Sequence, residues 1–143
     1  MDNQIKENSQ SVQSHLSILQ NVIQRMASNS SSSKAWCITL VSAILVIVAD
    51  KGKPHIALIS IIPILLFFVL DTYYLALENG FRNSYNHFIT KLHSGEIKKE
   101  DLFAVKPKGK LLKLFFESFV SFSIWPFYLT LLLMVYIIKI LVL

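Results

Sequence analysis

The chain contains a single cysteine, Cys37, so an intramolecular disulfide and a cysteine-based metal site are both excluded. Histidine is also scarce, and its four residues are scattered: His15, His55, His87 and His93. Only the last two share a predicted helix, and their six-residue spacing puts them on different faces, which argues against a zinc site. No P-loop and no nucleophile–histidine arrangement is present. The sequence therefore predicts a non-enzymatic protein with no cofactor and no metal.

Charge is missing from long stretches of the chain. Residues 35–49 and 56–70 are two runs of fifteen without a charged side chain. The polar turn between them, residues 50–55, contains glycine and proline, so two helices joined by it must run antiparallel. A helix that crosses the hydrocarbon core needs roughly 20 apolar residues, which each run reaches only with its flanks. We predict a transmembrane hairpin over residues 34–77.

A third apolar run favours this prediction over its alternative, a buried helical hairpin in a soluble protein. Residues 118–143 carry one charge, Lys139. With three such segments, too little polar chain remains to cover them in water. Hydrophobic residues make up 53% of the chain and the mean hydropathy is +0.51. The sequence therefore predicts an all-α integral membrane protein whose partners include membrane lipid.

The segment before the hairpin is patterned as a helix. Residues 1–10 are polar and expected to be disordered, whereas residues 11–33 predict a cytoplasmic amphipathic helix with apolar spacings of 4, 3, 4 and 3. Its apolar stripe consists of Val12, Leu16, Leu19, Ile23 and Met26. The same register continues through Ser30 and Ser33 to Cys37, Leu40, Ile44 and Ile47. This favours one helix over residues 11–49, while the serine-rich stretch 29–33 leaves a flexible linker open as the alternative.

A second stripe follows the hairpin. It consists of Tyr74, Leu77, Phe81, Tyr85 and Phe88, and it predicts a helix over residues 71–93. Since residues 11–33 and 71–93 leave the same side of the membrane, we expect them to form an antiparallel two-helix stalk in the cytoplasm. Two helices alone would leave much of the stripes exposed. We therefore expect a homo-oligomer, and a cytoplasmic protein partner encoded nearby, to cover them.

A basic segment separates the stalk from the last apolar run. Residues 78–113 carry eight basic side chains against four acidic ones. Residues 96–105 predict a short helix or turn, and residues 106–110 predict a basic loop that faces solvent or lipid phosphates. The positive-inside rule places this segment in the cytoplasm. The N-terminus is then inside and the C-terminus outside, as suits a bacterial inner membrane, and nucleic-acid binding is not expected.

Residues 114–143 are predicted to contain an interfacial segment and a third transmembrane helix. The apolar and aromatic residues 111–119, which lead into this segment, are expected to be partly interfacial and to enter the membrane obliquely. The spanning helix is expected over residues 120–140. Pro126 removes a backbone hydrogen bond and is expected to kink this helix.

Four charged residues lie at membrane depth: Lys34, Asp71, Glu117 and Lys139. An ionisable residue at this depth is a candidate functional residue. For Asp71, one interpretation is that it marks the inner membrane surface beside an aromatic belt. The other is that it pairs with Lys34 or Arg25, first as a structural contact and second as part of a gate. Glu117 is expected to pair with Lys113 one turn earlier, and Lys139 to reach the far surface with its long side chain.

Two stretches beside the predicted hairpin are similar to a known group. The first runs from Arg25-Met26-Ala27-Ser28-Asn29-Ser30 to Lys34-Ala35-Trp36, and the second is Leu70-Asp71-Thr72-Tyr73-Tyr74-Leu75 with Glu78, Phe81 and Arg82. Together with the hairpin, over residues 11–93, they resemble the SLATT-like two-transmembrane effectors of bacterial anti-phage defence. The resemblance implies a protein that oligomerises in the inner membrane and permeabilises or depolarises it when a cytoplasmic partner or signal triggers it. The third helix departs from the two-helix pattern of the group.

Two other functions stay open at this point. One is a membrane anchor or regulatory subunit that holds a soluble partner through the stalk without permeabilising the membrane. The other is a phage holin-like protein, which also has a few spanning helices. The long patterned stalk counts against the holin, because simple lysis would not need it.

Overall fold

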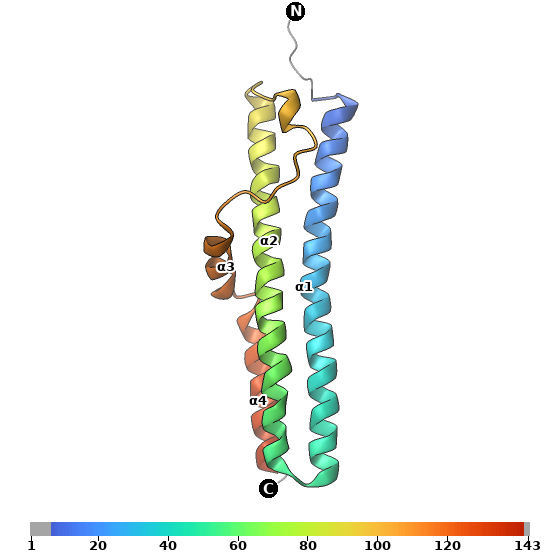
Figure 1. Ribbon diagram of the computed structural model, residues 1–143, viewed down its shortest axis with the longest axis vertical. Coiled ribbons are helices and arrows are strands. Elements are labelled where there is room, and N and C mark those ends of the chain that lie inside the picture. The colour runs from blue at the N-terminus through green and yellow to red at the C-terminus, as the bar shows by residue number, and fades with distance from the viewer. Residues whose placement is uncertain (1–6, 142–143) are drawn as a thin grey trace, which may run out of the picture.

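The computed structural model describes residues 7–141 and is an elongated bundle of α-helices (Figure 1). The described residues form four α-helices and two short 3₁₀ helices and contain no β-strand, so the predicted all-α class is confirmed. The helices are α1 (Gln10–Lys51), η1 (Pro54–Ser60), α2 (Ile61–His93), η2 (Lys99–Asp101), α3 (Leu111–Phe119) and α4 (Trp125–Leu141). The predicted disorder of residues 1–10 falls mostly on residues 1–6, which lie outside the described residues.

Helix α1 is continuous over 42 residues, about 63 Å at a rise of 1.5 Å per residue. The Ser9 side chain caps it by accepting a hydrogen bond from the backbone N–H of Val12, and Gly52 ends it with φ +59°. The serine-rich stretch lies inside the helix, where Ser33 donates its hydroxyl to the carbonyl of Asn29. The expectation of one continuous helix is confirmed, and the linker alternative is wrong.

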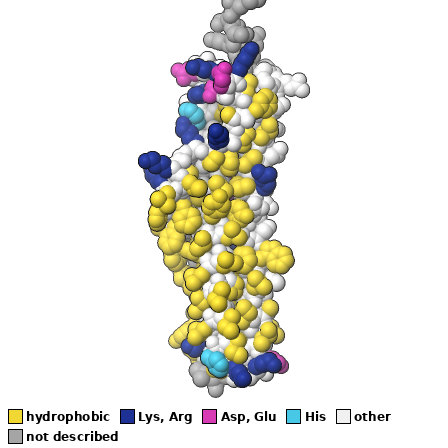
Figure 2. Space-filling view, in the orientation of Figure 1, with side chains coloured by type: hydrophobic (Ala, Val, Ile, Leu, Met, Phe, Trp, Pro, Cys, Tyr) yellow, Lys and Arg dark blue, Asp and Glu magenta, His cyan; other side chains and the backbone are white. Residues whose placement is uncertain are grey.

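Helices α1 and α2 run antiparallel side by side along the length of the molecule (Figure 1). Within residues 7–141, two segments are long and apolar enough to cross a membrane, namely α1 and the combined η1 and α2 segment Pro54–His93. We call residues 35–70 together with α4 the apolar half, and residues 10–34 of α1 with residues 71–93 of α2 the stalk. Figure 2 shows hydrophobic side chains over the middle of the rod and charged ones gathered towards its two ends.

Helix α4 packs against the hairpin in the apolar half, and it begins later than expected. It starts at Trp125, and residues 120–124 form turns in place of the first helical turn expected there. Pro126 is therefore the second residue of α4, and the expected kink at this residue is wrong. Proline costs no hydrogen bond in the first turn of a helix, where its missing N–H would have no partner. Ile124 is fully buried, and the indole N–H of Trp125 donates to the carbonyl of Phe119, which closes the turn.

The core of the apolar half is made by α1, η1, α2 and α4. The buried residues of α1 in this core are Cys37, Val41, Leu45 and Val48. The expected register is therefore shifted by one residue, since Leu40 and Ile47 are 44% and 50% exposed. A straight α-helix drifts by about 20° per heptad relative to a 3.5-residue repeat, so five heptads from Val12 amount to about one residue. Val48 therefore lies on the same face of α1 as Val12, where the heptad count had placed Ile47.

A segment we call the strap, residues 94–110, packs back onto the stalk. Ile97 is buried with Val12 and Phe88 in a second core. Further along, the backbone N–H of Lys108 donates to the carbonyl of Gly80 at 2.9 Å. A Cβ on Gly80 would lie only 2.7 Å from the Cβ of Pro107, so this close crossing needs glycine. The predicted short helix or turn over residues 96–105 is confirmed as η2 and its flanking turns.

The stalk buries its stripes only in part. Val12, Leu19, Met26 and Phe88 are buried, whereas Leu16, Ile23, Tyr74, Leu77, Phe81 and Tyr85 are half-buried. The strap supplies apolar cover where Ile97 and Leu102 pack on the second core. The stripe residues away from the strap keep exposed surface that a single copy of the chain leaves uncovered.

Candidate functional site: a buried charge cluster between the two long helices

Asp71 lies about one third of the way along α2 and is fully buried. Its Oδ1 accepts a hydrogen bond from the Ser30 hydroxyl at 2.5 Å, and its Oδ2 lies 2.6 Å from the Lys34 ammonium. Lys34 also donates to the Ser30 hydroxyl at 3.3 Å. The three side chains form a closed triangle, which we call the charge cluster. Of the two partners considered for Asp71, the structure shows Lys34, and Arg25 is exposed on α1.

The antiparallel register of the helices brings this cluster together. Ser30 and Lys34 are four residues apart on α1, so they lie on one face, one turn from each other. The same register places the Cys37 thiol 3.9 Å from the carbonyl of Pro63. Serine at position 30 is small enough to let the helices approach until its hydroxyl meets the carboxylate. The cluster therefore depends on helix pairing over the whole hairpin.

The charge cluster marks the junction between the stalk and the apolar half. On the apolar side of Asp71, α2 has no charged residue back to its start, and α1 has none from residue 35 to residue 49. The Lys34 side chain keeps 21% of its surface exposed, whereas that of Asp71 has none. Removing two charges from water is costly, and their close contact with a further hydrogen bond offsets that cost. Lys34 therefore compensates the buried carboxylate of Asp71.

Aromatic side chains close the apolar side of the cluster. Tyr128 of α4 donates its hydroxyl to the carbonyl of Phe67 at 3.0 Å, one turn before Asp71. The ring of Phe68 makes edge-on contacts with those of Phe119, Trp125 and Tyr128, at centroid distances of 5.3, 5.6 and 5.2 Å. These rings join α4 and the end of α3 to α2 just below the charges. Helix α4 therefore helps to close the apolar side of the cluster, a role that the sequence did not suggest.

The other two charges that the sequence predicted to lie at membrane depth are outside this cluster. Glu117 and Lys113 are neighbours, as expected, with 3.7 Å between their charged atoms, but both are largely exposed on α3. Lys139 lies half-buried in the last turn of α4. Neither joins the charge cluster, so of the four charges only Lys34 and Asp71 meet.

His15 is a buried polar residue that the sequence analysis missed. Its Nδ1 accepts a hydrogen bond from the backbone N–H of Phe103 in the strap at 2.9 Å, and its ring lies 4.3 Å from that of Phe88. Burial lowers the pKa of His15 below its ordinary value, and the carboxylate of Asp101 partly opposes this shift. Phe103 has φ +63°, an unusual conformation for a bulky residue. In the sequence, only the position of His15 on the predicted buried face of α1 could have indicated that it is buried.

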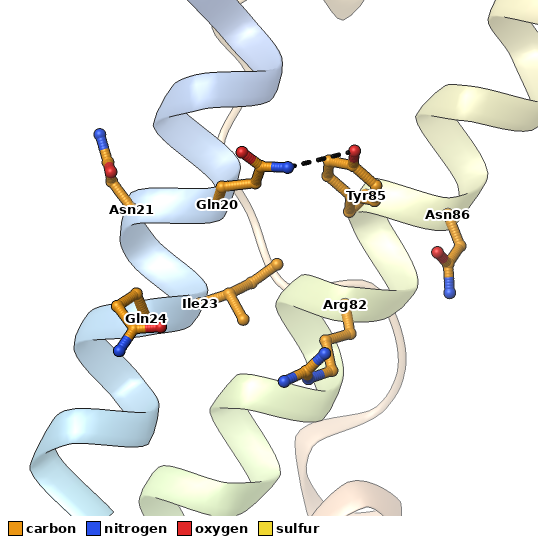
Figure 3. Close-up of a pocket in the computed structure, with 7 residues that line it drawn as sticks. All are labelled: Gln20, Asn21, Ile23, Gln24, Arg82, Tyr85 and Asn86. Carbon is orange, nitrogen blue, oxygen red and sulfur yellow. Dashed lines mark hydrogen bonds between the residues drawn. The ribbon is translucent and has the colours of Figure 1, made fainter.

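A groove of about 560 Å³ opens between α1 and α2 in the stalk (Figure 3). Its lining consists of Gln20, Asn21, Ile23, Gln24, Arg82, Tyr85 and Asn86. Gln20 reaches across it and donates to the Tyr85 hydroxyl at 3.4 Å. Ile23 and Tyr85 belong to the predicted stripes, so the stripe surface meets this groove, but amide side chains make up most of its wall. Such a wall offers hydrogen bonds to a partner more than an apolar contact.

Residues 7–141 bring together no group of three histidine, cysteine, aspartate or glutamate side chains that could hold a metal ion. The one arrangement that stands out chemically is the charge cluster, which can store a carboxylate and an ammonium out of water and release them when the helices separate. No protein-family model, curated protein or solved structure matches this chain.

Proposed function

We propose that the apolar half crosses a lipid bilayer, with the stalk in the cytoplasm of a bacterium. The support is the surface of the helices. In each of the two long segments, only 28% of the most apolar 18-residue window is buried. A core helix of a soluble protein would bury most of it. Large side chains such as Val46, Ile62 and Leu66 keep 63–69% of their surface exposed, and a bilayer is the surrounding that suits them.

We propose further that the chain is a membrane effector that oligomerises in the inner membrane and permeabilises or depolarises it when a cytoplasmic partner or signal acts on the stalk. The charge cluster is the observation that carries this proposal. Helices α1 and α2 are continuous from the stalk into the apolar half, so a change in their pairing at the stalk acts directly on Asp71 and Lys34. In the resting protein, the cluster holds the two helices together.

Release of the cluster supplies the chemical step of the proposal. When α1 and α2 separate, the carboxylate of Asp71 and the ammonium of Lys34 lose each other and must be hydrated. Ser30, Ser33 and Thr72 add buried hydroxyls on the same seam. Water drawn to these groups at membrane depth breaches the seal that the aromatic rings and apolar residues maintain. The context of anti-phage defence rests on the resemblance of residues 11–93 to SLATT-like effectors.

The experiment is membrane potential in bacteria that express the chain, followed with a voltage-sensitive dye. At an expression level where the wild type leaves the potential intact, we expect Asp71→Asn to depolarise the cells because it weakens the cluster. Leu19→Asp places a charge in the buried face of the stalk and weakens the pairing of α1 with α2 there, so we expect this variant to depolarise the cells as well. Glu117→Gln, which alters an exposed carboxylate, is the matched control and should behave as wild type.

Two outcomes would point to the other functions. A potential that stays intact for every variant and at every expression level would contradict the effector and favour a membrane anchor that holds a partner through the stalk groove. Lysis by the wild type at raised expression, with Leu19→Asp behaving as the wild type at every level, would favour a holin-like protein, because the stalk would then have no part in permeabilisation.

A further inference from the structure

Helix α3 has two different faces. Leu114 and Ser118 are buried against α2, and Ser118 accepts a hydrogen bond from the Asn79 side chain at 3.3 Å. The other side of α3 carries Leu112 and Phe116, which are 69% and 62% exposed. These two residues are four positions apart and lie on one face of the helix. The helix therefore presents an apolar surface outward at the level where the stalk meets the apolar half.

Four lysines lie shortly before this apolar surface in the sequence or within the same helix. Lys106, Lys108 and Lys110 are exposed in the loop before α3, and Lys113 follows on the helix. Residues 106–113 contain no acidic residue. The nearest acidic group on the helix is Glu117, at 3.7 Å from Lys113, and an exposed pair of this kind cancels little of the field. The segment is therefore rich in positive charge and leads directly into the helix that carries the exposed apolar side chains.

The backbone of this loop is fixed on α2. The carbonyl of Lys106 accepts the Ser84 hydroxyl at 2.5 Å, and the N–H of Lys108 donates to the carbonyl of Gly80. Gly80 lies nine residues beyond Asp71, which corresponds to about 14 Å along the helix. The headgroup layer occupies roughly 5–8 Å on each side of the hydrocarbon core. Long lysine side chains that start at this level can therefore meet lipid phosphates while α3 lies in the interface.

We propose that residues 106–116 bind the phosphate groups of anionic phospholipids in the leaflet that faces the stalk. Lys108, Lys110 and Lys113 contact the phosphates, and Leu112 and Phe116 enter the acyl layer beneath them. This inference rests on the proposed membrane insertion. The adjoining apolar side chains select a lipid over a nucleic acid or an acidic peptide, since neither of those offers an apolar phase directly beneath its charges.

Lipid binding at this site is also coupled to the packing at the tip of the stalk. The strap connects the basic loop to Ile97, which packs with Val12 and Phe88, and to Phe103, which donates to His15. A lipid that holds the loop in place therefore stabilises the strap and, through it, the pairing of α1 with α2. The charge of the surrounding leaflet becomes a condition for the resting state.

The test measures which lipids stay with the protein. The full chain is reconstituted into vesicles of phosphatidylcholine mixed with phosphatidylglycerol, extracted mildly, and its bound lipids are counted by native mass spectrometry. One basic residue near an anionic surface changes binding about fivefold, so Lys108→Gln with Lys110→Gln should lower the preference for phosphatidylglycerol about 25-fold. The matched control, Lys98→Gln with Lys99→Gln, alters two exposed lysines at the stalk tip and should keep the wild-type preference.

The outcomes separate this inference from the function it rests on. Flotation of the vesicles first reports whether the chain is inserted. Insertion with equal lipid preference in the wild type and both double variants overturns the headgroup site and leaves the membrane proposal standing. A chain that does not float with the vesicles overturns both. An equal loss of preference in both double variants also overturns the site, because it would reflect overall charge alone.

Discussion

Replacing Lys34 with alanine removes the only cation that contacts the Asp71 carboxylate in the part of the chain that the structure describes. The carboxylate has no exposed surface, so water cannot take the place of the ammonium without a change in helix packing. Removal of one partner from a buried ion pair costs about 3–5 kcal/mol, because it leaves the other charge uncompensated. Lys34 is itself 21% exposed, so we place the cost of Lys34→Ala near the lower end, at about 3 kcal/mol.

The opposite substitution should cost less. Asp71→Asn removes the buried charge and keeps a side chain that can accept the Ser30 hydroxyl. Lys34 then loses its partner but can extend its ammonium towards water, so we expect a loss of about 1–2 kcal/mol. The double variant should resemble Asp71→Asn alone, because neither a carboxylate nor an ammonium is left unpaired. This asymmetry follows from the different burial of the two side chains.

The assay is thermal unfolding of the purified chain in mild detergent, followed by the helical circular dichroism signal. A change of 3 kcal/mol corresponds to a melting temperature about 6–12 °C lower for a chain of this size. Lys113→Ala is the matched control, since it breaks an exposed lysine–carboxylate pair and should stay within about 0.5 kcal/mol of wild type. Equal losses for Lys34→Ala and Asp71→Asn that add in the double variant would refute the reasoning.

Two further predictions concern the strap. Gly80→Ala should destabilise the fold by about 1–3 kcal/mol, because its Cβ would lie 2.7 Å from that of Pro107, although alanine is the better helix former. The melting temperature measures this loss, and Asn86→Ala on the same helix is the control that should cause none. His15 has a lowered pKa, so its contribution to stability is complete above about pH 6.5 and is lost as the pH falls from there through the folded-state pKa. His15→Gln cannot titrate, so its melting temperature should fall less than that of the wild type between about pH 7.5 and about pH 5.5, and equal falls would count against a titrating His15.

Local periodicity was sufficient to predict the long helices. The spacing of apolar residues predicted a helix through the serine-rich stretch, and the polar turn predicted the antiparallel hairpin. The register in the apolar half was off by one residue because a heptad count assumes supercoiling, whereas α1 follows the 3.6-residue period of a straight helix. The kink at Pro126 failed for a different reason: the pattern of apolar residues does not reveal where a helix starts, and proline is common in the first turn.

The charge cluster could be predicted from the sequence, since Lys34 and Asp71 flank two uncharged runs of equal length on either side of one turn. A hairpin must bring such residues to the same level. The contact between His15 and Phe103 could not be predicted from the sequence, because it joins residues 88 positions apart and Phe103 lies in the strap, which has no periodic pattern. Such contacts depend on tertiary packing, which leaves no local pattern in the sequence.

The most direct test of the account is which side of the membrane each end of the hairpin occupies. Cys37 is the only cysteine, so a Cys37→Ala background allows single cysteines to be placed by His55→Cys in the turn or Gln24→Cys in the stalk. A membrane-impermeant thiol reagent is then added to intact spheroplasts and, separately, to lysed ones. We predict that the turn cysteine is labelled in both and the stalk cysteine only after lysis. Labelling of both positions only after lysis would contradict a hairpin that crosses the membrane and would favour a helical hairpin buried within a soluble assembly.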